Sequence, residues 1–303
     1  MSTELHAAGN TAIGFVGLGI MGEPMAANLL AAGYAVKVHN RSRPAVERLV
    51  EKGASEAASP AEAGQDVDVA VLMLPDTPDV EAVIEGEGGI GSTLAAGATL
   101  IDMSTISPVA TRRLAATLGD AGVAMLDAPV SGGQQGAIDG TLSIMVGGEE
   151  SAFEACRPIL NELGKNVTLT GGSGAGQVTK ACNQVIVAGT IQIVAEALTL
   201  AQRSGVDPST VRQALSGGFA SSKILEVHGQ RMLDGAFEPG FKVRLHAKDL
   251  AIALETGADA QAPLLSTGLV KQLLTSLIGQ GHGDKDHSSL AMLTRQLAGE
   301  DME

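Results

Sequence analysis

Lys180 is the residue of this sequence whose type and position best suit proton transfer. It lies four residues after Gly176, at the start of a helical pattern that runs from Gln177 to about Arg203. Residues 185–194 carry no charged side chain, so we expect this helix to be largely buried. Because burying a charge is costly unless the charge is paired or used, a lysine here is a candidate general acid or base. Two other roles stay open: a partner for a structural carboxylate, or an ammonium group that reaches solvent at the helix end.

A second group of residues is suited to binding a small carboxylate. Ser131 offers a hydroxyl, and Gly132 and Gly133 offer backbone N–H groups that no side chain shields. Asn183 lies three positions beyond Lys180 and therefore on the same face of the predicted helix.

A third group is suited to binding phosphate. An apolar run, Ala12–Val16, leads into a Gly-x-Gly-x-x-Gly sequence, and a helical pattern follows until about Gly33. In a strand–turn–helix, such glycines allow a sharp turn, close approach of a pyrophosphate, and tight packing of helix on strand. The free N–H groups of the helix N-terminus then face the phosphate charge. The sequence predicts a dinucleotide site here, with a purely structural turn as the alternative; its residues are Gly17, Leu18, Gly19, Ile20, Met21 and Gly22.

The loop after the next predicted strand, Ala35–His39, indicates which dinucleotide binds. NAD sites usually carry an acidic residue about 20 positions beyond the glycines. This chain has Asn40, Arg41, Ser42 and Arg43 there instead. A guanidinium pairs with a 2′-phosphate, which a carboxylate would repel. We therefore expect NADP(H) as the preferred cofactor and NAD(H) as the alternative, unless these arginines are only solvated loop residues.

Two further predicted strands end in loops that could line the cofactor. Val67–Leu74 is an apolar run that ends at Pro75, and Thr99–Asp102 leads to Thr105. Ligands of open α/β sheets bind at the carboxyl ends of the strands, which predicts cofactor contacts from Leu74, Pro75 and Thr105. The Thr105 hydroxyl could instead bond only its own backbone. Ser107 and Pro108 are expected to cap and open the following helix.

The elements that must position these residues form two predicted domains. Strands alternate with helices as far as residue 173, which indicates an α/β sheet; beyond it the pattern is helical. We predict a disordered tail at 1–11, a nucleotide-binding domain at 12–173, and an all-α substrate and oligomerisation domain at 174–303, joined by the long helix. The other predicted elements are strands Leu142–Val146 and Val167–Leu169, and helices Glu150–Leu163, one beginning at Asp207-Pro208, Pro263–Ile278 and Ser288–Leu297.

Composition excludes several classes of protein. The chain has 303 residues and a net charge of −14, without the basic cluster that a nucleic-acid-binding surface needs. Its two cysteines are too few for a disulfide framework and fit a reducing cytosol, so we expect a cytoplasmic protein. The N-terminus lacks the features of a signal peptide, and Val185–Ala201 is too short and too polar for a membrane span. No His, Cys and Asp set has metal-ligand spacing, although His246 and Asp286-His287 are weaker catalytic candidates.

The chain resembles the β-hydroxyacid dehydrogenase family from Gly14 to about Leu297. The motifs that carry the resemblance are Gly14–Gly22 (GFVGLGIMG), Asp127–Gly133 (DAPVSGG), Gly174–Gln184 (GAGQVTKACNQ) and Lys248–Leu250 (KDL). The lysine motif often ends in Asn-Asn in the family but ends in Asn183-Gln184 here, as in the tartronate semialdehyde reductase branch. Gly136–Ser143 (GAIDGTLS) and Leu245–Leu250 (LHAKDL) are also similar to that branch.

The resemblance implies a Rossmann-type doubly wound sheet, a long interdomain helix and a helical domain that forms homodimers or homotetramers. It implies that Lys180 is the catalytic acid or base, that Asn183 holds the substrate with Ser131, Gly132 and Gly133, that Thr105 lies near the nicotinamide, and that Lys248 reaches the cofactor. The expected reaction is reduction of 2-hydroxy-3-oxopropanoate to glycerate. Oxidation of 3-hydroxyisobutyrate and a non-catalytic NADP-binding protein remain alternatives.

Overall fold

The computed structural model describes residues 6–300 and divides the chain into two compact units. The first unit ends at Lys180 and the second begins at Ala181, so the division falls inside helix α8 (Ala175–Arg203). The sequence predicted the boundary a few residues earlier, between 173 and 174, where this helix begins.

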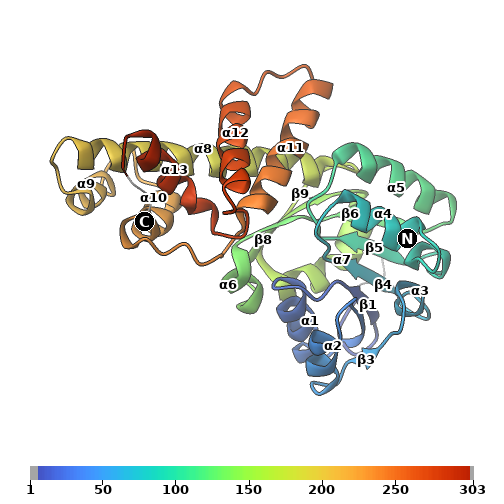
Figure 1. Cartoon of the computed structure of the whole chain (residues 1–303). Coiled ribbons are helices and arrows are strands. Elements are labelled where there is room, and N and C mark those ends of the chain that lie inside the picture. The colour runs from blue at the N-terminus through green and yellow to red at the C-terminus, as the bar shows by residue number, and fades with distance from the viewer. Residues whose placement is uncertain (1–5, 301–303) are drawn as a thin grey trace. The chain divides into compact units, whose positions relative to one another are not determined.

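The first unit is built on one sheet, in the strand order β3-β2-β1-β4-β5-β6-β8-β7, with β9 also paired to β8 (Figure 1). The six strands from β3 to β6 in this order run parallel to one another, whereas β8 is antiparallel to β6 and β7. The order reverses between β1 and β4, which makes their carboxyl ends the topological switch point of the sheet. The strands are β1 (Ala12–Val16), β2 (Ala35–His39), β3 (Ser55–Glu56), β4 (Val69–Leu72), β5 (Thr99–Asp102), β6 (Ala124–Asp127), β7 (Val130–Ser131), β8 (Leu142–Gly147) and β9 (Gly164–Gly171).

Helices cover both faces of this sheet, and each face has its own apolar core. On one face α1 (Gly22–Ala31), α2 (Arg43–Val50) and α7 (Glu150–Leu163) pack on side chains such as Phe15 and Ile101. On the other face α3 (Pro60–Ala63), α4 (Thr77–Glu85) and α5 (Pro108–Asp120) pack on Leu72 and Leu100. Burial on both faces explains why the central strands are apolar throughout. The remaining pieces are η1 (Ile90–Ser92) and α6 (Gly133–Ile138).

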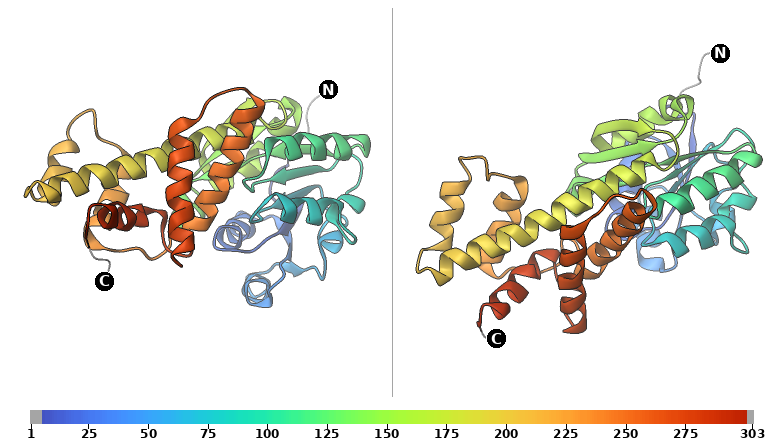
Figure 2. Two further views of the ribbon diagram at one scale, coloured as in Figure 1. Left: turned by 45° about the horizontal axis from the view of Figure 1, so that its top comes forward. Right: turned by 90° about the horizontal axis from the view of Figure 1, so that it is seen from above.

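The second unit is helical over its described residues, with one isolated bridge between Lys242 and Asp286. Its core gathers side chains from α8, α10, α11, α12 and α13, among them Ile191, Leu250 and Leu274. Figure 2 shows α11 and α12 as an adjacent orange pair. The helices after α8 are α9 (Pro208–Leu215), α10 (Lys223–Asp234), α11 (Val243–Asp259), α12 (Leu265–Gly279), η2 (His287–Ser289) and α13 (Leu290–Leu297).

Helix α8 is less buried than its apolar sequence predicted. Ile186, Ile193 and Leu200 are 66%, 65% and 68% exposed, whereas Ala188, Ile191 and Ala195 on the opposite side belong to the core. The sequence expectation that Val185–Ala201 is too short and too polar for a membrane span does not hold for the whole helix, because α8 is long and apolar enough by length and composition alone. Half of its most apolar window is buried in the fold, as in the core helix of a globular domain.

Several predicted boundaries move. The apolar run Val67–Leu74 contributes a strand only over Val69–Leu72, the helix predicted from Pro263 begins at Leu265, and the last helix begins at Leu290 after the short turn η2. Ser107 occupies the N-cap position of α5, but its side chain makes no capping bond. In the predicted tail, residues 1–5 lie outside the described residues, while the His6 N–H donates to the Ala155 carbonyl and Thr11 is buried.

Candidate active site

The glycine turn after β1 has the shape of a phosphate cradle. Gly17 has a φ of +99°, and a Cβ there would lie 2.3 Å from the Met73 carbonyl oxygen. A Cβ at Gly22 would lie 1.9 Å from the Gly17 carbonyl oxygen, so helix and turn pack too closely for any side chain. Gly19 differs, because a Cβ there meets nothing within 4 Å. The protein's own packing therefore does not require a glycine at position 19, whereas a pyrophosphate lying on this backbone would.

The loop after β2 is tied to that turn by Asn40. Its side-chain Oδ1 accepts a hydrogen bond of 3.0 Å from the Leu18 N–H, and its Nδ2 donates to Ser42. The two arginines of this loop differ in their surroundings. Arg43 is bonded to Glu47 and Glu56, whereas Arg41 is 84% exposed and lies 3.8 Å from Asp79. Arg41 is thus the more accessible cation for a 2′-phosphate.

The loops after β4 and β5 are fixed to one another. The Leu74 N–H donates to the Ser104 hydroxyl at 2.9 Å, and the Ser107 N–H donates to Thr77 Oγ1. Thr105 is half-buried within the second loop, and Pro75 follows Leu74 in the first. These residues lie beyond the carboxyl ends of neighbouring parallel strands, as the sequence predicted.

Lys180 is buried in the second turn of α8, with 6% of its surface exposed. Its Nζ donates a hydrogen bond of 2.8 Å to the carbonyl oxygen of Val130. Burial rules out the alternative in which the ammonium group reaches solvent. Val130 directly precedes Ser131, so the lysine is bonded to the segment proposed to hold the substrate. In that segment Ser131 is half-buried, while Gly132 and Gly133 are exposed and have positive φ angles.

Two buried side chains of this region, Asp127 and Gln177, have no role predicted from the sequence. The Asp127 carboxylate accepts from the Gly174 and Gln177 N–H groups at the start of α8. Burial raises the pKa of this carboxyl group, and the backbone donors oppose that rise. The Gln177 side chain bonds the loop after β5. The only sequence signal for Asp127 is its place inside the DAPVSGG motif.

In the second unit, the predicted residues Asn183 and Lys248 are joined by a polar network. Asn183 Nδ2 donates to Gln184 Oε1 at 2.7 Å, and Gln184 Nε2 donates to Asp249 Oδ2 at 2.5 Å. Lys248 Nζ lies 3.0 Å from the other oxygen of the buried Asp249. The glutamine that departs from the family's Asn-Asn pattern therefore bridges Asn183 to Asp249.

The histidines of this unit form a separate cluster. Possible ligand atoms of His228, Asp286 and His287 lie within 4.8 Å of one another, a grouping that the sequence spacing did not predict. Both Asp286 oxygens already accept hydrogen bonds, from the N–H groups of Gly240, Phe241 and Ser288. Arg231 also lies 3.6 Å from this carboxylate. Since a neighbouring cation and saturated oxygens disfavour a metal ion, we interpret the cluster as structural.

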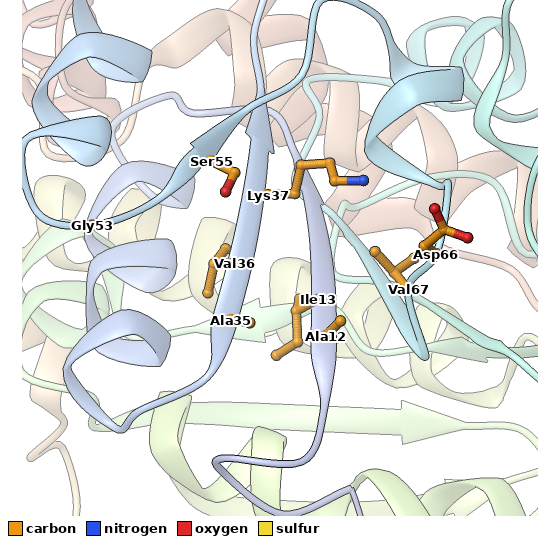
Figure 3. Close-up of a pocket in the computed structure, with 9 residues that line it drawn as sticks. All are labelled: Ala12, Ile13, Ala35, Val36, Lys37, Gly53, Ser55, Asp66 and Val67. Carbon is orange, nitrogen blue, oxygen red and sulfur yellow. The ribbon is translucent and has the colours of Figure 1, made fainter.

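The pocket drawn in Figure 3 lies at the other end of the sheet from the glycine turn. It has a volume of about 160 Å³ and is lined by the first residues of β1 and β2, such as Ala12 and Ala35. The Lys37 ammonium beside it bonds the carbonyl oxygens of Glu62 and Gln65. Because ligands of such sheets bind at the carboxyl ends of the strands, this pocket is not the candidate site.

Known proteins resemble this chain over nearly its full length. Residues 12–172 match the family model of the NAD binding domain of 6-phosphogluconate dehydrogenase. Residues 174–294 match the family model of the NAD-binding domain of NADP-dependent 3-hydroxyisobutyrate dehydrogenase. The chain is 46% identical to 2-hydroxy-3-oxopropionate reductase of Escherichia coli (strain K12), over 94% of this chain and 98% of the relative. It is 39% identical to 3-hydroxyisobutyrate dehydrogenase of Pseudomonas aeruginosa, over 94% and 99%.

A solved structure of Mycobacterium tuberculosis 3-hydroxyisobutyrate dehydrogenase with L-serine is similar to nearly all of this chain. Its TM-score is 0.86 at 31% identity, and the match covers 94% of this chain and 99% of that one. The likeness therefore extends over both units.

Proposed function

Because this chain belongs to the β-hydroxyacid dehydrogenase family of NAD(P)-dependent oxidoreductases, we propose that it reduces 2-hydroxy-3-oxopropanoate to glycerate. The observation that carries the choice of substrate is the 46% identity to the Escherichia coli 2-hydroxy-3-oxopropionate reductase over nearly the full length of both chains. The bridging Gln184 and the GAIDGTLS segment support the same choice.

In this proposal the chain's own residues bind the substrate and move one proton. The Ser131 hydroxyl and the N–H groups of Gly132 and Gly133 bind the substrate carboxylate. NADPH, when bound, supplies the hydride to the aldehyde carbon. The Lys180 ammonium donates a proton to the oxygen on which negative charge develops, and the Val130 carbonyl holds that ammonium in place. Asn183 is proposed to contact the substrate and Lys248 the cofactor, from the family resemblance.

We also propose NADP(H) as the preferred cofactor. The support is the absence of an acidic residue at 40–43 and the exposure of the Arg41 guanidinium. The remaining predicted contacts are Gly17–Gly22, Asn40, Ser42, Leu74, Pro75 and Thr105. NAD(H) is the second candidate.

The second candidate function is 3-hydroxyisobutyrate dehydrogenase, which the 39% identical Pseudomonas aeruginosa relative favours. The two substrates differ by a methyl and a hydroxyl group, and a site that hydrogen-bonds a hydroxyl discriminates strongly against a substrate without it. Measuring kcat/KM for both semialdehydes with NADPH separates the two. We expect a preference for 2-hydroxy-3-oxopropanoate; a larger value for methylmalonate semialdehyde would overturn the substrate proposal. Turnover of neither would favour a non-catalytic NADP-binding protein.

Two further proposals concern the state of the protein in the cell. We propose a homodimer or homotetramer in the cytoplasm, from the family resemblance and the two cysteines, of which Cys156 is buried. Light scattering coupled to gel filtration tests the subunit number, and a monomer at micromolar concentration contradicts it.

A further inference from the structure

The segment from Asp127 to Ser131 is bonded to the start of α8 at two points. Asp127 Oδ1 accepts from the Gly174 N–H at 2.7 Å, and Oδ2 accepts from the Gln177 N–H at 2.9 Å. Three residues further along the same segment, the Val130 carbonyl accepts from Lys180 Nζ. The segment therefore holds both the beginning of the helix and the lysine one turn later.

The chemistry of Asp127 suits this position. Both of its oxygens act as acceptors, which is the bonding pattern of an ionised carboxylate. The first N–H groups of a helix lack intrahelical partners and carry partial positive charge, so a carboxylate there satisfies them. Asp127 is completely buried, and water cannot replace these bonds if they are lost.

Two glycines allow the close approach. A Cβ at Gly176 would lie 2.9 Å from Asp127 Oδ2 and 2.4 Å from the Met145 carbonyl oxygen. A Cβ at Gly147 would lie 2.6 Å from Asp127 Oδ1. Sheet and helix are thus in close contact around the carboxylate, and neither glycine leaves room for a side chain.

The Gln177 side chain makes a second connection, to the loop that carries Thr105. Its Oε1 accepts from the Ile106 N–H at 3.1 Å, and its Nε2 donates to the Ser104 carbonyl at 2.8 Å. The side chain is 1% exposed. The first turn of α8 is therefore fixed to the ends of two neighbouring strands, β5 and β6.

We propose that Asp127 is a positioning residue for the reaction and that Gln177 assists it. Together they set the axial and rotational register of α8 so that the Lys180 ammonium faces the substrate-binding segment. A register change of one residue would move Lys180 by about 1.5 Å along the helix and turn it by about 100°. Displacements of about 1 Å can lower a rate on the order of 100-fold. This inference rests on the proposed role of Lys180 as proton donor.

The kinetic test uses Asp127→Asn, which keeps the size of the side chain but replaces one acceptor by a donor. We expect kcat to fall roughly 10-fold to 100-fold while KM for NADPH changes less than about twofold. Gln177→Met keeps the backbone N–H that bonds Asp127 but removes the two side-chain hydrogen bonds. It should lower kcat by a smaller factor than Asp127→Asn. Asp207→Asn is the matched control, because Asp207 caps α9 through the Ser209 and Thr210 N–H groups; it should leave kcat unchanged.

A double-mutant cycle separates positioning from general destabilisation. If Asp127 acts through Lys180, adding Asp127→Asn to Lys180→Ala should not lower the residual turnover further. An equal loss in both backgrounds, or no loss of kcat in Asp127→Asn, overturns the proposal.

A chemical readout tests the register without relying on turnover. In the wild-type protein without cofactor, the buried Lys180 should react slowly with an amine-acetylating reagent, measured by mass spectrometry against the other lysines. Asp127→Asn and Gln177→Met should raise the labelling of Lys180 several-fold, and Asp207→Asn should not. If the labelling rises but Lys180→Ala retains full turnover, the register inference stands and the proton-donor role fails. If the labelling of Lys180 is unchanged in both Asp127→Asn and Gln177→Met, the proposal that these residues set the register of α8 is wrong.

Discussion

Among single residues, Lys180 is the one on which the proposed chemistry depends most directly. Lys180→Ala should lower kcat by about 10²–10⁴, the usual contribution of general acid catalysis, and leave the Kd for NADPH nearly unchanged. The control is Lys165→Ala, which removes an exposed lysine of β9 and should be neutral. Steady-state kinetics and a cofactor fluorescence titration measure both quantities. Near-normal turnover of Lys180→Ala contradicts the mechanism.

Arg41 is the residue expected to determine the preference for NADP(H) over NAD(H). A hydrogen bond between charged groups contributes about 1.5–3 kcal/mol, so Arg41→Ala should weaken NADPH binding roughly 10-fold to 100-fold and NADH binding much less. Arg43→Ala serves as the comparison, because Arg43 is bonded to Glu47 and Glu56 and should affect the two cofactors alike. Equal losses for both cofactors in Arg41→Ala would remove the basis for the NADP preference.

The sequence was informative where a residue type is unusual for its surroundings. A lysine just before the uncharged stretch 185–194 and a Gly-x-Gly-x-x-Gly turn between strand and helix are such cases, and both are found where predicted. The connection of Asp127 to Gly174 joins residues 47 apart in the chain. No local pattern reveals such a bond, because a carboxyl group at a strand end is equally compatible with a solvated loop.

Among elements, those with a strong local pattern agree with prediction to the residue. Strands β1, β2 and β5 and helix α7 have the predicted bounds, because apolar runs end at turn residues. The extent of burial on α8 was the main error. The uncharged stretch 185–194 predicts a largely buried helix, but the fold covers one side and leaves Ile186 and Ile193 exposed. Which side is covered depends on tertiary packing, which sequence composition does not encode.

The histidine cluster that joins α10, α11 and η2 predicts sensitivity to acid. Burial lowers the pKa of His287 well below its usual value, with nearby His246 adding to the effect, and burial also lowers the pKa of His228. The unfolded chain therefore binds more protons below about pH 6.5. Stability is fully present above that pH and should be lost as the pH falls below it.

Thermal denaturation between pH 7.5 and 5 measures this effect. We expect the Tm of the wild-type protein to fall as the pH is lowered. The Tm of His287→Gln should fall less steeply, because one titrating group is missing. A Tm that does not change between pH 7 and 5 would contradict the prediction. The pKa of Asp286 is also lowered, so its contribution is lost only near pH 4 and below.

For the whole molecule, cofactor binding can be measured as an increase in thermal stability. A ligand that binds only the folded protein, present at 100 times its Kd, stabilises it by about 2.7 kcal/mol. NADP⁺ should therefore raise Tm, and hydrogen exchange should slow within residues 12–172. The shift at a fixed NADP⁺ concentration should be smaller in Arg41→Ala than in Arg43→Ala. Absence of any shift with either NADP⁺ or NAD⁺ would contradict cofactor binding.

The hydrogen bond between His6 and Tyr34 within the first unit has a spectroscopic consequence. The chain has no tryptophan and one tyrosine, Tyr34, whose buried hydroxyl donates to the His6 carbonyl. Burial raises the pKa of this phenol, and the charge of Glu162 adds to the rise. Alkaline titration of the ultraviolet spectrum therefore follows the ionisation of Tyr34 alone among tyrosines. Its midpoint is expected above the ordinary tyrosine pKa of about 10. The single tyrosine therefore reports whether His6 keeps its place beside Tyr34.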